Sequence, residues 1–292
     1  MPTTLPPALI RLARIVAVAV IIGVGISELW FAVTGWTQSD ATAYWHAAQR
    51  LREGQPLYPV VSDVEASDVY RYAPWFAWLA VPFTFLPVQV AGAIWSAVLV
   101  GASVLAVVPL ARRRAWLQVA FFFPILIGIS AYGNVQALMI APLAWFIGGR
   151  SGPLWVGIAA SLKIFPILYV LTYLGRGQWV RALVAVAVAA LLWAPALFLD
   201  MHGYVTDVGQ AGLFGSTIAY YLVAGVCVAA AVVLSRTRFG WLSSAVAVIL
   251  VASRFFIYDL TYFLAGTSKV SLKVGTTGIA EAPEDLGQTH PA

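Results

Sequence analysis

Long uncharged apolar runs limit most strongly how this chain can fold. The segment 88–111 contains no Asp, Glu, Lys or Arg, and a transmembrane helix needs about 20 mostly apolar residues. Within a bilayer every backbone polar group must find a partner inside the protein, so only helices and closed barrels cross. The apolar residues are continuous rather than alternating, which favours helices over barrel strands.

The composition of the chain excludes several classes of protein. Of 292 residues, 61% are hydrophobic and 10% are charged, against roughly 45–50% and 25% in soluble domains. An ordinary soluble globule and a long disordered protein are therefore excluded. The single cysteine, Cys227, lies in an apolar run, which excludes a disulfide framework and a cysteine metal site. The net charge of +5 does not indicate a nucleic-acid partner, because most basic residues stand at the ends of apolar runs.

The apolar runs predict an all-α, polytopic transmembrane helical bundle. The predicted spans, of which the last is short, are 8–33, 88–111, 115–131, 133–149, 179–199, 213–235 and 240–253. The first span is too long for a cleaved signal, and residues 75–86 are too short to cross. We expect one membrane domain over 1–266 and a polar, disordered tail over 267–292.

Residues 153–175 are ambiguous, because Lys163 and Pro166 interrupt their middle. If this segment is broken there and returns to the side it came from, ten basic residues and no acidic one share one face. These are Arg11, Arg14, Arg112, Arg113, Arg114, Arg150, Arg176, Arg181, Arg236 and Arg238. If it crosses once, they are divided between the two sides. The positive-inside rule favours a re-entrant hairpin and a cytoplasmic amino terminus.

The longest hydrophilic stretch, 34–74, is then an extracytoplasmic loop. Residues 39–53 predict a short amphipathic helix along the membrane interface, with Ser39 or Asp40 as its N-cap and Gly54 at its end. Asp40 has two interpretations at this stage. It either caps the helix, or acts as a general base whose pKa is tuned by burial.

Lys163 needs an anionic partner, because a lysine at mid-membrane costs about 2.5–3.5 kcal/mol. The partner is either a ligand phosphate or a carboxylate, for which Asp40, Glu28 and Asp259 are candidates. Arg254 follows the last predicted span, and an Arg and a Lys that converge on one cavity suit a phosphate. An ion pair between Arg254 and Asp259 is the competing interpretation.

Asn134 and Gln136 stand at a predicted outer turn, where their amides either satisfy helix ends or bind a sugar or phosphate. His46 and His202 lack the spacing of metal ligands, and no HExxH, CxxC, Walker A or dinucleotide motif is present. We therefore expect no metal and no cofactor.

Several short elements follow one another in a characteristic order. They are Asp40, Tyr44–Trp45, Ala47–Ala48, Gly54 to Tyr58, Tyr70 to Pro74, Leu86–Pro87, Gly133 to Gln136, Lys163 to Pro166 and Tyr258 to Leu260. In this order the chain resembles the polyprenyl-phosphate-mannose-dependent enzymes of glycosyltransferase family 87, integral membrane proteins with the C-type glycosyltransferase fold. The third-last element departs from the family pattern, because its two amides, Asn134 and Gln136, are exchanged.

The resemblance implies transfer of a hexose, most simply mannose, from a polyprenyl-phosphate donor to a lipid or glycan acceptor at the extracytoplasmic face of the cell membrane. Arabinose or glucose would fit the same residues. Asp40 would be the base of an inverting reaction, and Lys163 and Arg254 would bind the donor phosphate. Further substrate-binding candidates are Tyr44, Tyr58, Tyr72, Asn134, Gln136, Tyr258 and Asp259.

Two other functions fit the same sequence. A transporter or flippase for a lipid-linked substrate would also place Lys163 and Arg254 at a cavity, and a truncated, non-catalytic relative would use Asp40 only as a helix cap. Sugar transfer that depends on Asp40 would separate the enzyme from both.

Overall fold

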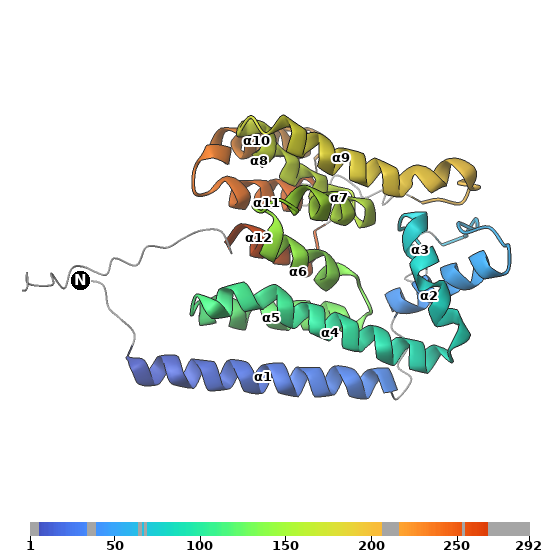
Figure 1. Ribbon diagram of the computed structural model, residues 1–292, viewed down its shortest axis with the longest axis horizontal. Helices are drawn as coiled ribbons and strands as arrows, with labels where there is room; N and C mark the ends of the chain where they lie inside the picture. Colours follow the sequence, from blue (N-terminus) through green and yellow to red (C-terminus); the bar gives the residue numbers. More distant parts are fainter. Residues whose placement is uncertain are drawn as a thin grey trace, which may run out of the picture.

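The computed structural model describes residues 6–33, 39–63, 66, 69–205, 216–252 and 255–267, and every regular element in these ranges is a helix. Most of the long helices run along one direction, with two short helices grouped at one end (Figure 1). The prediction of an all-α bundle is confirmed. The predicted tail lies outside the described residues except for Thr267.

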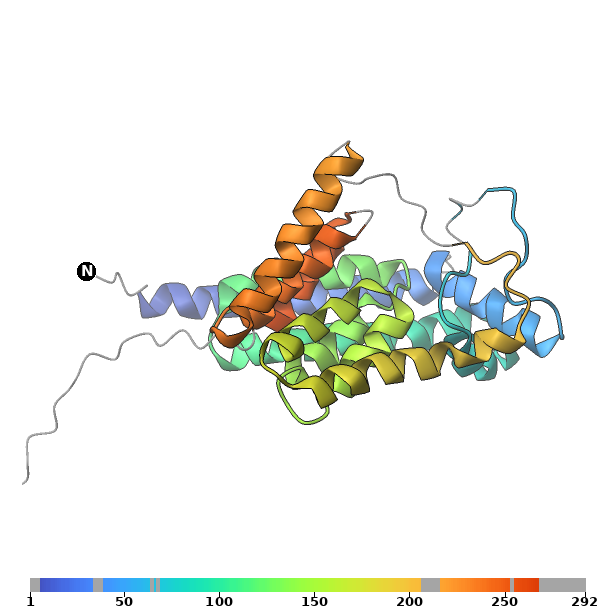
Figure 2. The same ribbon diagram turned by 90° about the horizontal axis from the view of Figure 1, so that it is seen from above.

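The helices over predicted spans are α1 (Pro7–Val33), α4 (Val88–Arg112), α5 (Trp116–Ala131), α6 (Gln136–Phe146), α9 (Trp179–Trp193), α10 (Thr217–Val233) and α11 (Gly240–Val251). Four helical stretches of the described chain are long and apolar enough to cross a membrane. One lies in α1 and one in α4, the third is α9 together with the 3-10 turn that follows it, and the fourth is α10 together with the 3-10 turn that follows it. The chain is therefore a multi-pass membrane protein. Figure 2 shows α10 and α11 side by side and inclined to the other helices.

The segment 153–175 turns back on itself, as predicted. Helix α7 (Gly152–Leu162) ends at the extended residue Lys163, and a 3-10 turn (Phe165–Tyr169) leads into α8 (Val170–Gly175). The hydroxyl of Tyr173, near the end of α8, donates a 2.7 Å hydrogen bond to the carbonyl of Ile147, just before α7. Both ends of the hairpin therefore lie at the same end of the bundle.

Arginine side chains at that end of the bundle contact neighbouring turns and helix ends. Arg112 lies 4.7 Å above the Trp145 ring, which places the end of α4 beside the end of α6. Arg176 donates to the carbonyl of Ser235 at 2.7 Å, and Arg236 donates to the carbonyl of Gly175 at 3.0 Å. The basic turns after α4, α8 and α10 thus share one end, as the hairpin prediction requires. The side of the membrane that this end faces remains a prediction.

The opposite end of the bundle carries α2 (Ser39–Arg52), α3 (Pro74–Ala80) and a 3-10 turn (Val81–Phe85). Tyr44, Ala47 and Ala48 of α2 are buried, and α2 packs against α3 and α4. Gly54 follows α2 with a φ of +69°, a value that suits glycine at a helix end. The apolar face of the predicted helix is therefore covered by protein.

The re-entrant hairpin predicts which sites share one side of the membrane. In a Cys227→Ala background, single cysteines at the exposed positions Arg113 and Arg238 should be labelled from one side, and a cysteine at Val60 from the other. An impermeant maleimide applied to oriented vesicles measures this. Labelling of Arg113→Cys and Arg238→Cys from opposite sides would show that α7 and α8 cross the membrane together as one span.

Candidate functional site

A turn between α5 and α6 is fixed against the first turn of α2. Gly133 has a φ of +78°, and a Cβ atom there would lie 2.6 Å from the Cβ of Ala41. Asp40 donates its backbone N–H to the carbonyl of Tyr132 at 3.0 Å, and the Trp95 indole donates to the carbonyl of Gly133 at 2.8 Å. Only glycine fits this conformation and this close approach. The turn therefore brings the next residue, Asn134, to Asp40.

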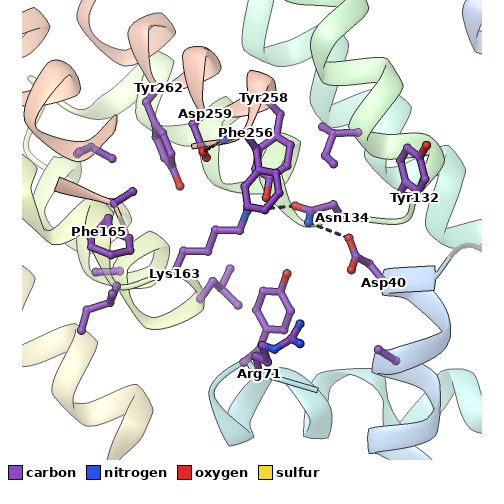
Figure 3. Close-up of a pocket in the computed structure, with 18 of the residues that line it drawn as sticks. Asp40, Arg71, Tyr132, Asn134, Lys163, Phe165, Phe256, Tyr258, Asp259 and Tyr262 are labelled. Carbon is purple, nitrogen blue, oxygen red and sulfur yellow. Dashed lines mark hydrogen bonds between the residues drawn. The ribbon is translucent and has the colours of Figure 1, made fainter. Parts of the chain in front are cut away.

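The side chain of Asn134 joins Asp40 to Lys163 (Figure 3). Its Nδ2 atom donates to Oδ2 of Asp40 at 2.8 Å, and its Oδ1 atom accepts from Nζ of Lys163 at 3.4 Å. Oδ1 also accepts the backbone N–H of Gln136 at 3.0 Å. Because two donors point at Oδ1, the Nδ2 group must face the carboxylate. The amide thus bridges a carboxylate and an ammonium group.

Lys163 is held at the tip of the hairpin by two further contacts. Its Nζ atom donates to Oε1 of the fully buried Gln136 at 3.0 Å, and lies 4.5 Å from the centre of the Tyr258 ring, a cation–π distance. Gln136 is itself fixed, because its Nε2 atom donates to Thr261 at 3.0 Å. The break in the hairpin therefore points the ammonium group at the amides of the α5–α6 turn.

Burial raises the pKa of Asp40 from its ordinary value of 3.8, while the hydrogen bond from Asn134 and the charges of Lys163 and Arg71 lower it. Burial also raises the pKa of Asp259, against the charge of Lys163 and a hydrogen bond from the Phe256 N–H. That bond, at 2.8 Å, closes the turn before the 3-10 helix Ile257–Tyr262. Of the two carboxylates, Asp40 is bonded to the amide bridge, whereas Asp259 stabilises its own turn.

Asp40, Asn134 and Lys163 line a cavity of about 1210 Å³. Part of the cavity wall is apolar and is formed by residues of α5, by the end of α11 and by Ile257. A second group of wall residues is mainly aromatic and charged. This second group is formed by Val69, Arg71, Tyr72, Trp193, Tyr204 and Val205.

The structure brings six of the ten predicted site residues to this cavity: Asp40, Tyr72, Asn134, Lys163, Tyr258 and Asp259. Tyr44, Tyr58 and Gln136 are buried and do not line it. Tyr44 packs edge-on against Tyr72 at 5.1 Å, and the Tyr58 hydroxyl donates to the carbonyl of Tyr72 at 2.8 Å. Arg254 lies outside the described residues.

Sequence reasoning missed several cavity residues, among them Arg71, Trp193 and Tyr204. Arg71 carried a signal, because it stands between the two tyrosines of the element Tyr70–Pro74. Trp193 and Tyr204 carried none, since only the fold brings the end of α9 and its following loop to this cavity. In the described ranges, no three His, Cys, Asp or Glu side chains gather as a metal site.

Comparison with known proteins gives three findings. The profile of glycosyltransferase family 87 matches residues 70–215, which is half of the chain and includes Asn134 and Lys163 but not Asp40. GPI mannosyltransferase 1 of Eremothecium gossypii is 28% identical in an alignment 149 residues long, which covers 47% of this chain and 36% of that protein. The chain thus matches about a third of that relative's length. No solved structure matches the chain.

Substitution of Gly133 tests how tightly the α5–α6 turn is held against α2. An alanine at a left-handed position costs roughly 1–2 kcal/mol, and forced overpacking a further 1–3 kcal/mol. Gly133→Ala should therefore lower the melting temperature of the detergent-solubilised protein more than Gly54→Ala does. Gly54 is a matched control, because its φ is also positive and a Cβ atom there meets nothing within 4 Å. Equal melting temperatures would show that the turn can move away from Ala41.

Proposed function

Because the chain belongs to glycosyltransferase family 87, we propose that it transfers mannose from a polyprenyl-phosphate donor to a lipid or glycan acceptor, with inversion at the anomeric carbon. The observation that carries the proposal is the bridge from Asp40 through Asn134 to Lys163 in one cavity. It supplies a base and a phosphate ligand side by side. The mannosyltransferase name of the E. gossypii relative supports the choice of sugar.

The apolar wall of the cavity supports a lipid-linked donor. On α5, Pro124 and Gly128 are exposed four residues apart, with Ile125 and Ile129 half-buried beside them. Val248 of α11 and Ala252, which follows α11, also line the cavity. A prenyl chain bound there would remain among apolar groups while its phosphate reached Lys163, where an ammonium group stabilises the charge that develops on the leaving phosphate.

Asp40 is suited to activate the acceptor hydroxyl. As the acceptor oxygen attacks, a new bond forms from that oxygen to the anomeric carbon, and the bond from this carbon to the phosphate oxygen breaks. Asp40 takes the hydroxyl proton, and the phosphate leaves with the bonding electrons toward Lys163. The width of one side-chain amide separates the base from the phosphate ligand, so the two can act on opposite faces of the sugar.

We place the cavity on the extracytoplasmic side of the membrane. The arginine-linked turns lie at the other end of the bundle, and basic turns favour the cytoplasm. A donor whose sugar is displayed outside would reach Lys163 from the outer leaflet.

The proposal is tested by incubating membranes that contain the protein with polyprenyl phosphates carrying mannose, glucose or arabinose, and by mass analysis of the products. Mannose transfer should depend on Asp40. Asp40→Asn should reduce the rate by about 10²–10⁴-fold, because the amide cannot take a proton. Asp63→Asn, an exposed position in the same loop, is the matched control. Wild-type turnover in Asp40→Asn would place the base elsewhere, and no transfer by the unmodified protein would refute the function.

The raised pKa of Asp40 predicts the acid limb of the pH–rate profile. The base acts as a carboxylate, so activity should fall as the pH drops through its pKa, with a midpoint above 3.8. Asn134→Ala removes the hydrogen bond that favours the ionised form, so this midpoint should move to a higher pH. Tyr132→Phe alters another cavity side chain and should leave the midpoint unchanged. An unchanged midpoint in Asn134→Ala would separate Asp40 from the pH dependence.

A further inference from the structure

The cavity has a group of wall residues that the donor does not need. If the prenyl phosphate occupies Lys163 and the apolar wall, the wall formed by Arg71, Tyr72, Trp193 and Tyr204 is left for the second substrate. In Figure 3, Arg71 lies on the side of the cavity opposite Tyr258 and Asp259, with Asp40 and Lys163 between them. An acceptor in this part would present its hydroxyl to Asp40 from the side away from the leaving phosphate.

The backbone on both sides of Arg71 is held in place. The Tyr70 hydroxyl donates to the carbonyl of Ala73 at 2.8 Å, and the Tyr58 hydroxyl donates to the carbonyl of Tyr72 at 2.8 Å. Tyr70 itself is buried against Tyr58, with ring centres 5.9 Å apart. Arg71 therefore lines the cavity from a fixed loop, with its Nη2 atom donating to the carbonyl of Ala66 at 3.4 Å. It is close enough to Asp40 for its charge to lower the pKa of that carboxyl group.

The walls beside Arg71 suit a sugar. Trp193 and Tyr204 pack edge-on at 5.5 Å, and the Trp193 indole donates to the carbonyl of Ser161 at 3.0 Å, which fixes its ring at the cavity edge. Apolar ring faces of this kind pack against the C–H face of a sugar ring. Arginine adds a planar fork of donors, which matches the oxygens of a phosphate better than it matches a neutral hydroxyl.

We propose that this part of the cavity is the acceptor subsite, and that Arg71 recognises a phosphate group carried by the acceptor. The inference rests on the proposed function, since it takes Lys163 as the donor-phosphate ligand. Two positively charged side chains of one cavity thus bind different phosphates. Lys163 binds the donor phosphate, which leaves, and Arg71 binds the acceptor phosphate, which remains on the product.

Binding measurements on the purified full chain in lipid nanodiscs test this assignment without relying on turnover. Three probes are compared: undecaprenyl phosphate, dodecyl mannoside, and dodecyl mannoside carrying a phosphate on the sugar. Arg71→Gln should weaken binding of the phosphorylated mannoside by about 10- to 100-fold, the range for losing a hydrogen bond to a charged group. It should leave the other two probes unchanged. Lys163→Gln should instead weaken the binding of undecaprenyl phosphate.

Two variants and one competitor complete the test. Arg71→Lys keeps the charge without the fork and should bind the phosphorylated mannoside with intermediate affinity, while Arg150→Gln, an exposed position at the other end of the bundle, should match the unmodified protein. Inorganic phosphate should compete weakly. Competition as strong as that of the phosphorylated mannoside would indicate a site for free phosphate and overturn the proposal.

Three other results would also overturn it. Arg71→Gln could weaken the binding of both mannosides equally, or it could weaken the binding of undecaprenyl phosphate. The third such result is that the unmodified protein binds both mannosides with the same affinity. Failure of the proposed function has a different signature, namely no sugar transfer by the unmodified protein from any polyprenyl phosphate. The binding result decides the role of Arg71 in either case.

Discussion

The amide of Asn134 is the contact on which the candidate site depends. It donates to Asp40 and accepts from Lys163, so one side chain sets the spacing of the proposed base and the proposed phosphate ligand, which come from different segments. Its position depends in turn on Gly133, because only a glycine can come so close to Ala41. A small residue in the α5–α6 turn thus determines where opposite charges meet in a largely apolar protein.

The bilayer explains why the chain folds in this way around a lysine. A charged side chain at membrane depth must face protein or water, and irregular backbone is tolerated there only under the same condition. The break at Lys163 satisfies both requirements, because the hairpin tip points the ammonium group at Asn134 and Gln136. The same break returns α8 to the end from which α7 started, which gathers the arginine-rich turns on one side.

The sequence predicted those features that depend on local composition. Apolar runs predicted the spans, and the distribution of arginines predicted the hairpin. Helix α6 begins later than its predicted span, because the turn at Gly133 and Asn134 takes up the first residues of that span. Tyr44 and Tyr58 were expected at the substrate, but they pack behind Tyr72. Such contacts, like the approach of Trp193 and Tyr204 to the cavity, depend on how separate helices pack, which apolar periodicity does not encode.

The most direct test of this account is a structure of the full-length Asp40→Asn variant with a polyprenyl-phosphate mannose bound. The account predicts that phosphate oxygens lie within hydrogen-bond distance of Nζ of Lys163, that the prenyl chain follows the apolar wall of α5 and α11, and that the anomeric carbon faces residue 40. A donor whose phosphate binds away from Lys163, or whose anomeric carbon faces away from residue 40, would contradict it.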